Sequence, residues 1–263
     1  MDSKSKKNKA LSLIETFCRK ARTLFSMLHS GVLVWQDGID PRCMAYDERL
    51  RYLGLQSALN HKDDIVAYDI GANRGDFASF LVKLPTLEAV YCFEPVPDVF
   101  QELLYKTQTS KNIRCFQVAL GDQCGMKRMY VNDFSPSSSM LPIDPIHIEE
   151  FPHTEKSYEV EVRMMTLEEA VREFRLLPPD FIKIDVQGFE DRVINGGREI
   201  IKRAKFCMLE LSLVSLYEES LLLPEMNRLM RELGFSLISI VDKIIGKSGE
   251  ILQLDGLYRN KTI

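Results

Sequence analysis

From residue 64 onward, short apolar runs alternate with segments of helical periodicity. The runs are Ile65–Ile70, Ala89–Phe93, Ile113–Leu120, Phe181–Val186 and Phe206–Leu211. Apolar runs of this length predict strands that are buried on both faces of a sheet. Because helical segments separate the runs, we expect an α/β fold with a mostly parallel sheet and helices on both sides.

Capping and turn residues delimit the helices between these runs. Thr166 and Glu169 have the spacing of a capping box, which predicts a helix that continues to about Phe174. The segment from Gly188 to Ala204 is either one helix or two helices broken at the adjacent glycines 196 and 197. Further helices are expected over residues 78–84, 99–104 and 222–233.

The two C-terminal runs, Phe235–Val241 and Leu252–Tyr258, have little between them beyond residues 243–249. A crossover between parallel strands needs about a dozen residues or more. We therefore expect these two runs to form an antiparallel pair.

Residues 122–165 interrupt the strand–helix alternation. Lys127–Val131 and Tyr158–Met164 alternate enough to predict a β-hairpin or two added strands. Between them lies a segment rich in Ser and Pro, residues 135–139. Its serines 137–139 would suit hydrogen bonding to a polyol, although a flexible linker has the same composition.

The first 60 residues differ from the rest, and we expect a basic helical extension over residues 1–60 and one domain over residues 61–263. Apolar spacing predicts helices over 10–29 and 45–60. Residues 1–30 hold seven Lys and Arg against two acidic residues, a net charge of +5. Such a segment either contacts an anionic membrane surface weakly or is a solvated terminus.

Several classes of protein do not fit this sequence. The whole chain has a net charge of −4 and gives no electrostatic sign of nucleic-acid binding. It has neither an apolar run of spanning length nor the pattern of a signal peptide. Its six cysteines show no CxxC pair or zinc spacing, so we expect a reduced, cytoplasmic protein. No metal ligands are assigned, although Asp185 and other acids at the strand edge could gather a cation, so metal dependence stays open.

The strongest functional signal is the segment Asp69–Gly75, which follows the first strand. Gly71 and Gly75 permit a tight turn and a close approach of the backbone to a ligand. The segment lacks the Gly-Lys-Ser/Thr ending of a phosphate loop and the G-x-G-x-x-G spacing of a dinucleotide site. The acidic Asp69 favours a ligand with a cationic part.

Glu94 ends the second strand and gives the second signal. A carboxylate at this place accepts hydrogen bonds from a ribose diol in nucleotide-binding sheets. The alternative is a surface carboxylate before Pro95.

These segments resemble the FkbM-type S-adenosylmethionine-dependent methyltransferases over about residues 64–240. Five motifs carry the resemblance: residues 69–75, 93–95, 119–122, 137–139 and 182–190. The resemblance implies a seven-stranded, Rossmann-like methyltransferase sheet that ends in an antiparallel pair. It also implies O-methylation, often of a sugar hydroxyl. Gln187 stands where many members carry Glu, so we assign no role to a carboxylate there.

The resemblance also implies roles for individual residues. The methionine end of S-adenosyl-L-methionine would be held by Asp69, Gly71, Asn73 and Gly75, the ribose by Glu94, and the adenine by Asp122 or its neighbours. For Asp122, a turn-forming Gly-Asp pair is an equally good interpretation.

Removing the acceptor's proton calls for a base. The candidates are Asp185, Lys183, Glu210 and the loop residues His147 and His153. Lys183, in a central strand, either pairs with Asp185 or Asp69, acts on the acceptor, or extends its head to solvent. Each histidine is otherwise an ordinary loop residue.

We therefore predict a methyltransferase that acts on a hydroxyl of a sugar or glycosylated metabolite. Three alternatives stay open: an amide or carboxyl acceptor, a nicotinamide-dependent reductase, and a non-catalytic member of the fold that binds a partner through residues 10–29. The acceptor's identity and the oligomeric state do not follow from the sequence.

Overall fold

The structure is a computed structural model that describes residues 59, 64–132 and 135–263. The basic extension and the predicted helix over 10–29 lie outside the described residues, as does the predicted helix over 45–60 apart from Leu59. The domain boundary at residue 60 stays a prediction.

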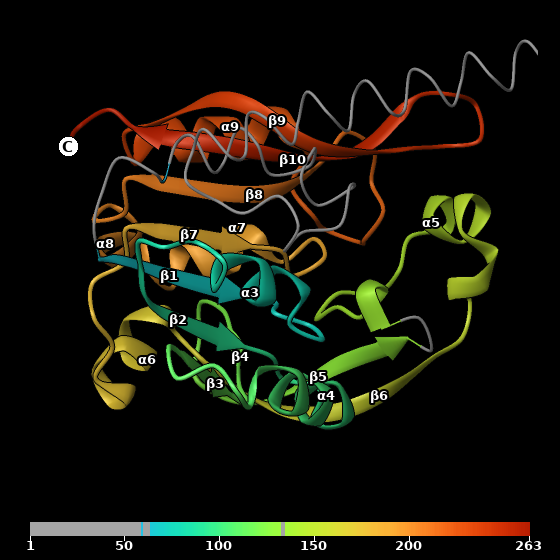
Figure 1. Cartoon of the computed structure of the whole chain (residues 1–263). Helices are drawn as coiled ribbons and strands as arrows, with labels where there is room; N and C mark the ends of the chain where they lie inside the picture. The colour runs from blue at the N-terminus through green and yellow to red at the C-terminus, as the bar shows by residue number, and fades with distance from the viewer. Residues whose placement is uncertain (1–58, 60–63, 133–134) are drawn as a thin grey trace, which may run out of the picture. The chain divides into compact units, whose positions relative to one another are not determined.

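A seven-stranded sheet organises the described residues (Figure 1). Its strand order is β3-β2-β1-β7-β8-β10-β9. The strands are β1 (Ile65–Ile70), β2 (Leu87–Phe93), β3 (Ile113–Phe116), β7 (Phe181–Ile184), β8 (Phe206–Ser212), β9 (Phe235–Ile245) and β10 (Ile251–Asn260). The first strand coincides with the predicted run.

Five neighbouring strands of this sheet, β3, β2, β1, β7 and β8, run parallel to one another. The C-terminal pair of β9 and β10 does not. β1 pairs in parallel with β2 and β7, while β10 lies antiparallel to both β8 and β9. The predicted fold class, a mostly parallel seven-stranded sheet with an antiparallel pair at its end, is confirmed. The short connection between β9 and β10 leaves no room for a crossover.

One predicted strand is wrong. The run Ile113–Leu120 is expected to be a single strand, but it divides into β3 and a two-residue strand, β4 (Ala119–Leu120). The amide of Val118 donates to the carbonyl of Phe116, which turns the chain out of the main sheet. The run does not reveal such a turn, because its apolar residues continue on both sides of Gln117 although only β4 is fully buried.

β4 belongs to a second, three-stranded sheet of order β4-β6-β5. Its other members, β5 (Gly125–Asn132) and β6 (Ser157–Met165), pair antiparallel and confirm the two added strands predicted in the insertion. Their inner side chains pack against Val96 and Val99. Between β5 and β6 lie the 3-10 helices η2 (Ser135–Ser137) and η3 (Pro152–Thr154) and the helix α5 (Pro145–Glu150).

Helices cover both faces of the main sheet. On one face, α3 (Asp76–Leu81) packs through Phe77 against Phe181 of β7. On the other face, the core contains side chains of Tyr68 and Ile70 together with those of four helices. These are α6 (Leu167–Phe174), α7 (Glu190–Asn195), α8 (Arg198–Ile201) and α9 (Leu223–Glu232), while α4 (Pro97–Thr107) follows β2.

The capping prediction is confirmed, because the amide of Glu169 donates to Oγ1 of Thr166 at the start of α6. The open question after Gly188 is also settled. α7 and α8 are two short helices separated at Gly196 and Gly197. A Cβ atom at Gly196 would lie 1.9 Å from the carbonyl oxygen of Gly121. Because Gly196 has no side chain, the backbone between α7 and α8 can lie against the loop after β4.

Gly71 plays a similar part between β1 and β7. Its φ is +78°, and a Cβ atom there would lie 1.8 Å from the carbonyl oxygen of Asp185. The amide of Asp185 in turn donates to the carbonyl of Ile70. The ends of the two central strands are thereby held at backbone contact, which brings the residues that follow them together.

Gly71→Ala should therefore destabilise the fold more than Gly249→Ala does. Gly249 also has a positive φ, +88°, but a Cβ atom there would meet nothing within 4 Å. We expect a loss of about 1 kcal/mol at residue 249 from backbone strain alone, and at least about 3 kcal/mol at residue 71. Urea unfolding measures both, and equal losses would contradict the close approach.

Candidate active site

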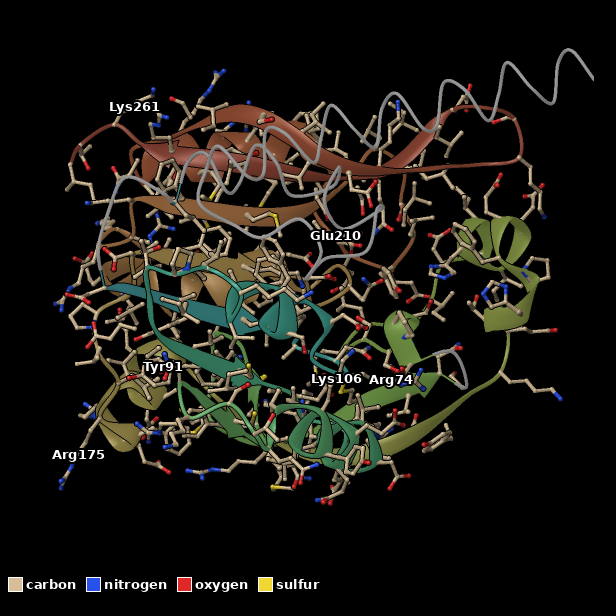
Figure 2. The ribbon with its side chains drawn as sticks, in the orientation of Figure 1. Arg74, Tyr91, Lys106, Arg175, Glu210 and Lys261 are labelled. Carbon is tan, nitrogen blue, oxygen red and sulfur yellow. The ribbon has the colours of Figure 1, made fainter. Side chains whose placement is uncertain are left out.

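The carboxyl ends of four parallel strands bring the predicted site residues to one edge of the sheet. Asp69 lies near the end of β1, Glu94 follows β2, Asp185 follows β7 and Glu210 lies in β8. Figure 2 shows Glu210 in the middle of the picture, whereas Arg175 and Lys261 project outward. In open α/β sheets this edge is where ligands bind.

The glycine segment after β1 forms a tight turn with three positive φ angles. They are 78° at Gly71, 46° at Asn73 and 82° at Gly75. The amides of Gly71 and Ala72 both donate to the carbonyl of Phe93 at the end of β2. The segment is thereby fixed against the neighbouring strand.

Glu94 connects this turn to the start of α4 through two hydrogen bonds. Its Oε2 accepts from the amide of Asn73 at 2.9 Å and its Oε1 from the amide of Val96 at 2.9 Å. Burial raises the pKa of Glu94 to about 7, against the opposing effect of these two amides. Each oxygen keeps a second lone pair, so a diol contact is still compatible with this geometry.

Asp69 and Lys183 form an ion pair across β1 and β7. They are register partners, and Lys183 Nζ lies 3.7 Å from Asp69 Oδ1. Burial raises the pKa of Asp69 to about 6, although Lys183 acts to lower it. Because the side chain of Asp69 has no exposed surface, it supports the site through Lys183 and offers no open surface to a ligand.

Lys183 pairs with both Asp185 and Asp69, the contacts that its scaffold interpretation expects. Its ammonium lies 2.9 Å from Asp185 Oδ2 and over the ring of Phe77. Burial acts to lower the pKa of Lys183, but the carboxylates of Asp185 and Asp69 raise it above the usual value. Lys183 is therefore a fixed positive charge and a poor candidate for a base.

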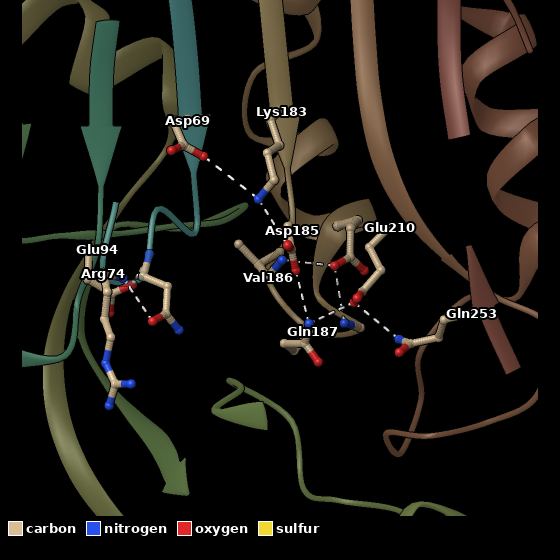
Figure 3. A network of polar contacts seen from close by, with 12 residues as sticks. Asp69, Arg74, Glu94, Lys183, Asp185, Val186, Gln187, Glu210 and Gln253 are labelled. Carbon is tan, nitrogen blue, oxygen red and sulfur yellow. Dashed lines mark hydrogen bonds and ion pairs between the residues drawn. The ribbon is translucent and has the colours of Figure 1, made fainter. Parts of the chain in front are cut away.

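Asp185 and Glu210 are joined by Gln187 (Figure 3). Its Nε2 donates to Asp185 Oδ1 at 2.9 Å and to Glu210 Oε2 at 2.8 Å. Gln253 also donates to Glu210, at 3.1 Å. Burial, and then the charge of Asp185, raise the pKa of Glu210 well above its usual range.

Gln187 and Tyr217 belong to this group but are not among the site residues predicted from the sequence. Tyr217 Oη donates to Gln187 Oε1 at 2.7 Å, and Ser139 Oγ donates to the main-chain carbonyl of Gln187 at 2.6 Å. The signals for Gln187 in the sequence were its place in the motif 182–190, where many family members carry Glu, and its position two residues after Asp185. Tyr217 lies in a loop with no recognisable motif.

Carboxylates outnumber basic groups at this edge. Glu190 lies directly behind it, accepting from the amides of Val186 at 3.0 Å and Gly188 at 3.2 Å through one oxygen, Oε1. Burial raises the pKa of Glu190 to about 7, against the opposing effect of the amides it accepts from. Lys183 faces two of the site's carboxylates, Asp69 and Asp185. A cationic ligand is therefore favoured here.

Two hydroxyls of the serine segment, those of Ser138 and Ser139, make hydrogen bonds within the protein. Ser139 Oγ, besides its bond to Gln187, accepts from the amide of Leu141, and Ser138 Oγ accepts from the amide of Asn132. These two hydroxyls serve internal contacts, which weakens their predicted role in polyol binding. Ser135 Oγ lies 3.4 Å from Asn73 Oδ1 in the glycine turn, and Ser139 contacts Gln187. The segment therefore connects the glycine turn to the carboxyl groups of Asp185 and Glu210.

Two predicted residues lie apart from this group. His147 is buried in α5, where its ring packs against Phe151 and Tyr217. Burial lowers its pKa. It therefore reaches the site only through Tyr217. Asp122 is exposed in the turn after β4, next to Gly121, which packs against Gly196.

The glycine turn, the acid after β2 and the antiparallel C-terminal pair together define the Rossmann-like methyltransferase architecture. The Methyltransferase FkbM domain matches residues 69–237, more than half of the chain. The chain belongs to the FkbM methyltransferase family.

Two relatives agree with this assignment. The 2-O-methyltransferase NoeI of Sinorhizobium fredii is 30% identical over 175 residues, 62% of this chain and 70% of the relative. The hexuronic acid methyltransferase AglP of Haloferax volcanii is 25% identical over 183 residues, 66% of this chain and 70% of the relative. The predicted family and the predicted enzyme class, an O-methyltransferase, are confirmed.

The solved structure of an FkbM methyltransferase from Methylobacillus flagellatus is also similar. It has 17% sequence identity and a TM-score of 0.49, and the match covers 81% of this chain. This chain spans about half, 49%, of that protein. Among the described residues, no helix is long and apolar enough to cross a bilayer.

Glu190→Gln should stabilise the protein above neutral pH. The amide oxygen keeps both main-chain hydrogen bonds, while the buried charge is lost. Because the folded-state pKa of about 7 exceeds the unfolded value, the free energy of unfolding of the wild type falls as pH rises through about 4.5 to 7. We expect a gain on the order of 2 kcal/mol at pH 8 that shrinks as the pH falls and disappears below about pH 4.5.

Denaturant unfolding across this pH range measures the difference. Glu225→Gln, on the exposed face of α9, is the matched control and should change stability by at most a few tenths of a kcal/mol. A Glu190→Gln effect that is the same at pH 5 and pH 8 would contradict the buried-charge account.

Proposed function

We propose that this protein transfers a methyl group from S-adenosyl-L-methionine to a hydroxyl of a sugar, with hexuronic acids and their glycosides as the first acceptors to test. The observation that carries the proposal is the carboxylate pair of Asp185 and Glu210, joined by Gln187 beside the glycine turn. The two relatives, a 2-O-methyltransferase and a hexuronic acid methyltransferase, support the acceptor class.

The residues at this edge suit the proposed cosubstrate. S-Adenosyl-L-methionine, when bound, supplies an electrophilic methyl group on a positively charged sulfur, and its loss leaves a neutral thioether. Gly71, Asn73 and Gly75 would receive the methionine end and Glu94 the ribose. Asp69 would contribute indirectly, by holding Lys183 in place. Asp122 stays a candidate for binding the adenine.

Asp185 is the best-placed proton acceptor. Its carboxylate is 29% exposed, and Lys183 Nζ at 2.9 Å stabilises a negative charge on it. As the acceptor oxygen bonds to the methyl carbon, the hydroxyl proton passes to Asp185 and then to solvent. Lys183 keeps its own proton and holds Asp185 in place. Most of the rate enhancement then comes from orientation of the acceptor, with the base adding to it.

The test is methyl transfer from labelled S-adenosyl-L-methionine to glucuronate glycosides and to the matching glucosides. We expect a methyl ether on a ring hydroxyl, identified by NMR of the product. Asp185→Asn should lower kcat by about 10²- to 10⁴-fold, the usual contribution of a general base.

Three other outcomes would each indicate one of the alternative functions, and a fourth concerns the base. A methyl ester found only with the uronate would contradict the hydroxyl assignment. Binding of NADH in place of the sulfur nucleoside would indicate a reductase. A folded protein that binds neither ligand would be a non-catalytic member of the fold. Full activity of Asp185→Asn would reject Asp185 as the base.

A further inference from the structure

We infer that Gln187 is a positioning residue for the proposed reaction: its side-chain amide keeps Asp185 and Glu210 in one fixed arrangement and holds Asp185 ready to accept a proton. This inference rests on the proposed function, because it presumes that Asp185 is the base. It assigns a task to a residue that acts through Asp185, to which its side-chain amide donates.

The first support is the double donation of one amide group. Nε2 of Gln187 has two hydrogens, and its two acceptors, Asp185 Oδ1 and Glu210 Oε2, lie at 2.9 and 2.8 Å. Two carboxyl groups this close repel each other when both are ionised. A group with two donors and no charge holds them together without adding a third charge.

The second support is that the partners of the amide favour one orientation. Its Oε1 accepts from Tyr217 Oη at 2.7 Å. A flipped amide would direct its oxygen at the two carboxyl groups, which would bring acceptor against acceptor. The buried phenol of Tyr217 and the two acids therefore specify the same orientation.

The third support is the fixed main chain around Gln187. Its φ of 57° is left-handed, which is unfavourable for a residue with a side chain. The carbonyl of Gln187 accepts from Ser139 Oγ, and Glu190 accepts from the amides of the residues on either side, Val186 and Gly188. Strain kept in place by this many contacts is typical of functional positions.

Loss of the Gln187 donor has a predictable sign. A hydrogen bond to the ionised form of a carboxyl group favours that form, so removal of the bond raises the pH at which Asp185 loses its proton. Gln187→Met has a similar length and no donor. Gln187→Glu keeps the shape and the contact with Tyr217, but adds a third carboxyl group. Both changes should move the ionisation of Asp185 upward.

The experiment measures kcat against pH for wild type, Gln187→Met, Gln187→Glu and Gln253→Met. Gln253 is the matched control, because its amide donates to Glu210 and Ser212. We expect the acidic limb to move up by about one pH unit in both variants of Gln187. In Gln187→Met, kcat should also fall about 10- to 100-fold at neutral pH, the effect of losing hydrogen bonds to charged groups.

A second readout does not depend on turnover. The side-chain carboxyl ¹³C resonance of Asp185, assigned by its loss in Asp185→Asn, should titrate about one pH unit higher in Gln187→Met than in the wild type. It should be nearly unchanged in Gln253→Met. Thermal unfolding of each variant shows whether the fold is retained.

Two results would overturn the inference: an unshifted limb and resonance in both folded variants of Gln187, or an equal shift in Gln253→Met. If both variants of Gln187 fail to fold, its role is in folding and the inference is also wrong. A wild type that transfers no methyl group would reject the proposed function alone, since the resonance still reports on how Gln187 affects Asp185.

Discussion

The buried ammonium of Lys183 is the charge on which the site depends. It lies between the carboxylates of Asp69 and Asp185 at the ends of the two central strands. A lysine at this depth is stable only because both acids face it, and removal of either partner would leave an uncompensated buried charge. The same contacts fix Asp185 at the strand end, next to the backbone contact between β1 and β7 that Gly71 permits.

The site around this ammonium contains more carboxyl groups than the single positive charge of Lys183 can neutralise. Burial raises the pKa of Asp69 to about 6, and burial likewise raises the pKa values of Glu94 and Glu190 to about 7. Main-chain amides compensate Glu94 and Glu190 in part, and the Gln187 side chain compensates Asp185, through dipoles that carry no net charge. The remaining negative potential suits a ligand that carries its own positive charge.

Local patterns predicted most of the fold, because apolar runs, capping residues and short connections act over a few residues. The first strand and the Thr166 cap are confirmed on that basis. The division of the run Ile113–Leu120 depends on which sheet each half joins. The orientation of Gln187 depends on Tyr217 and Ser139, which lie 30 and 48 residues away in the chain. Contacts of that kind depend on the tertiary structure, and the local sequence contains no sign of them.

The central claim is that this acidic edge binds a cationic sulfur nucleoside. Calorimetry at pH 6.5, in two buffers of different ionisation enthalpy, measures the protons released on binding. S-Adenosylhomocysteine is the matched ligand, since it lacks only the methyl group and the positive charge. The account predicts that S-adenosyl-L-methionine releases more protons, because its charge lowers the pKa of acids that are partly protonated at this pH. Equal release by the two ligands, or no binding of either, would contradict it.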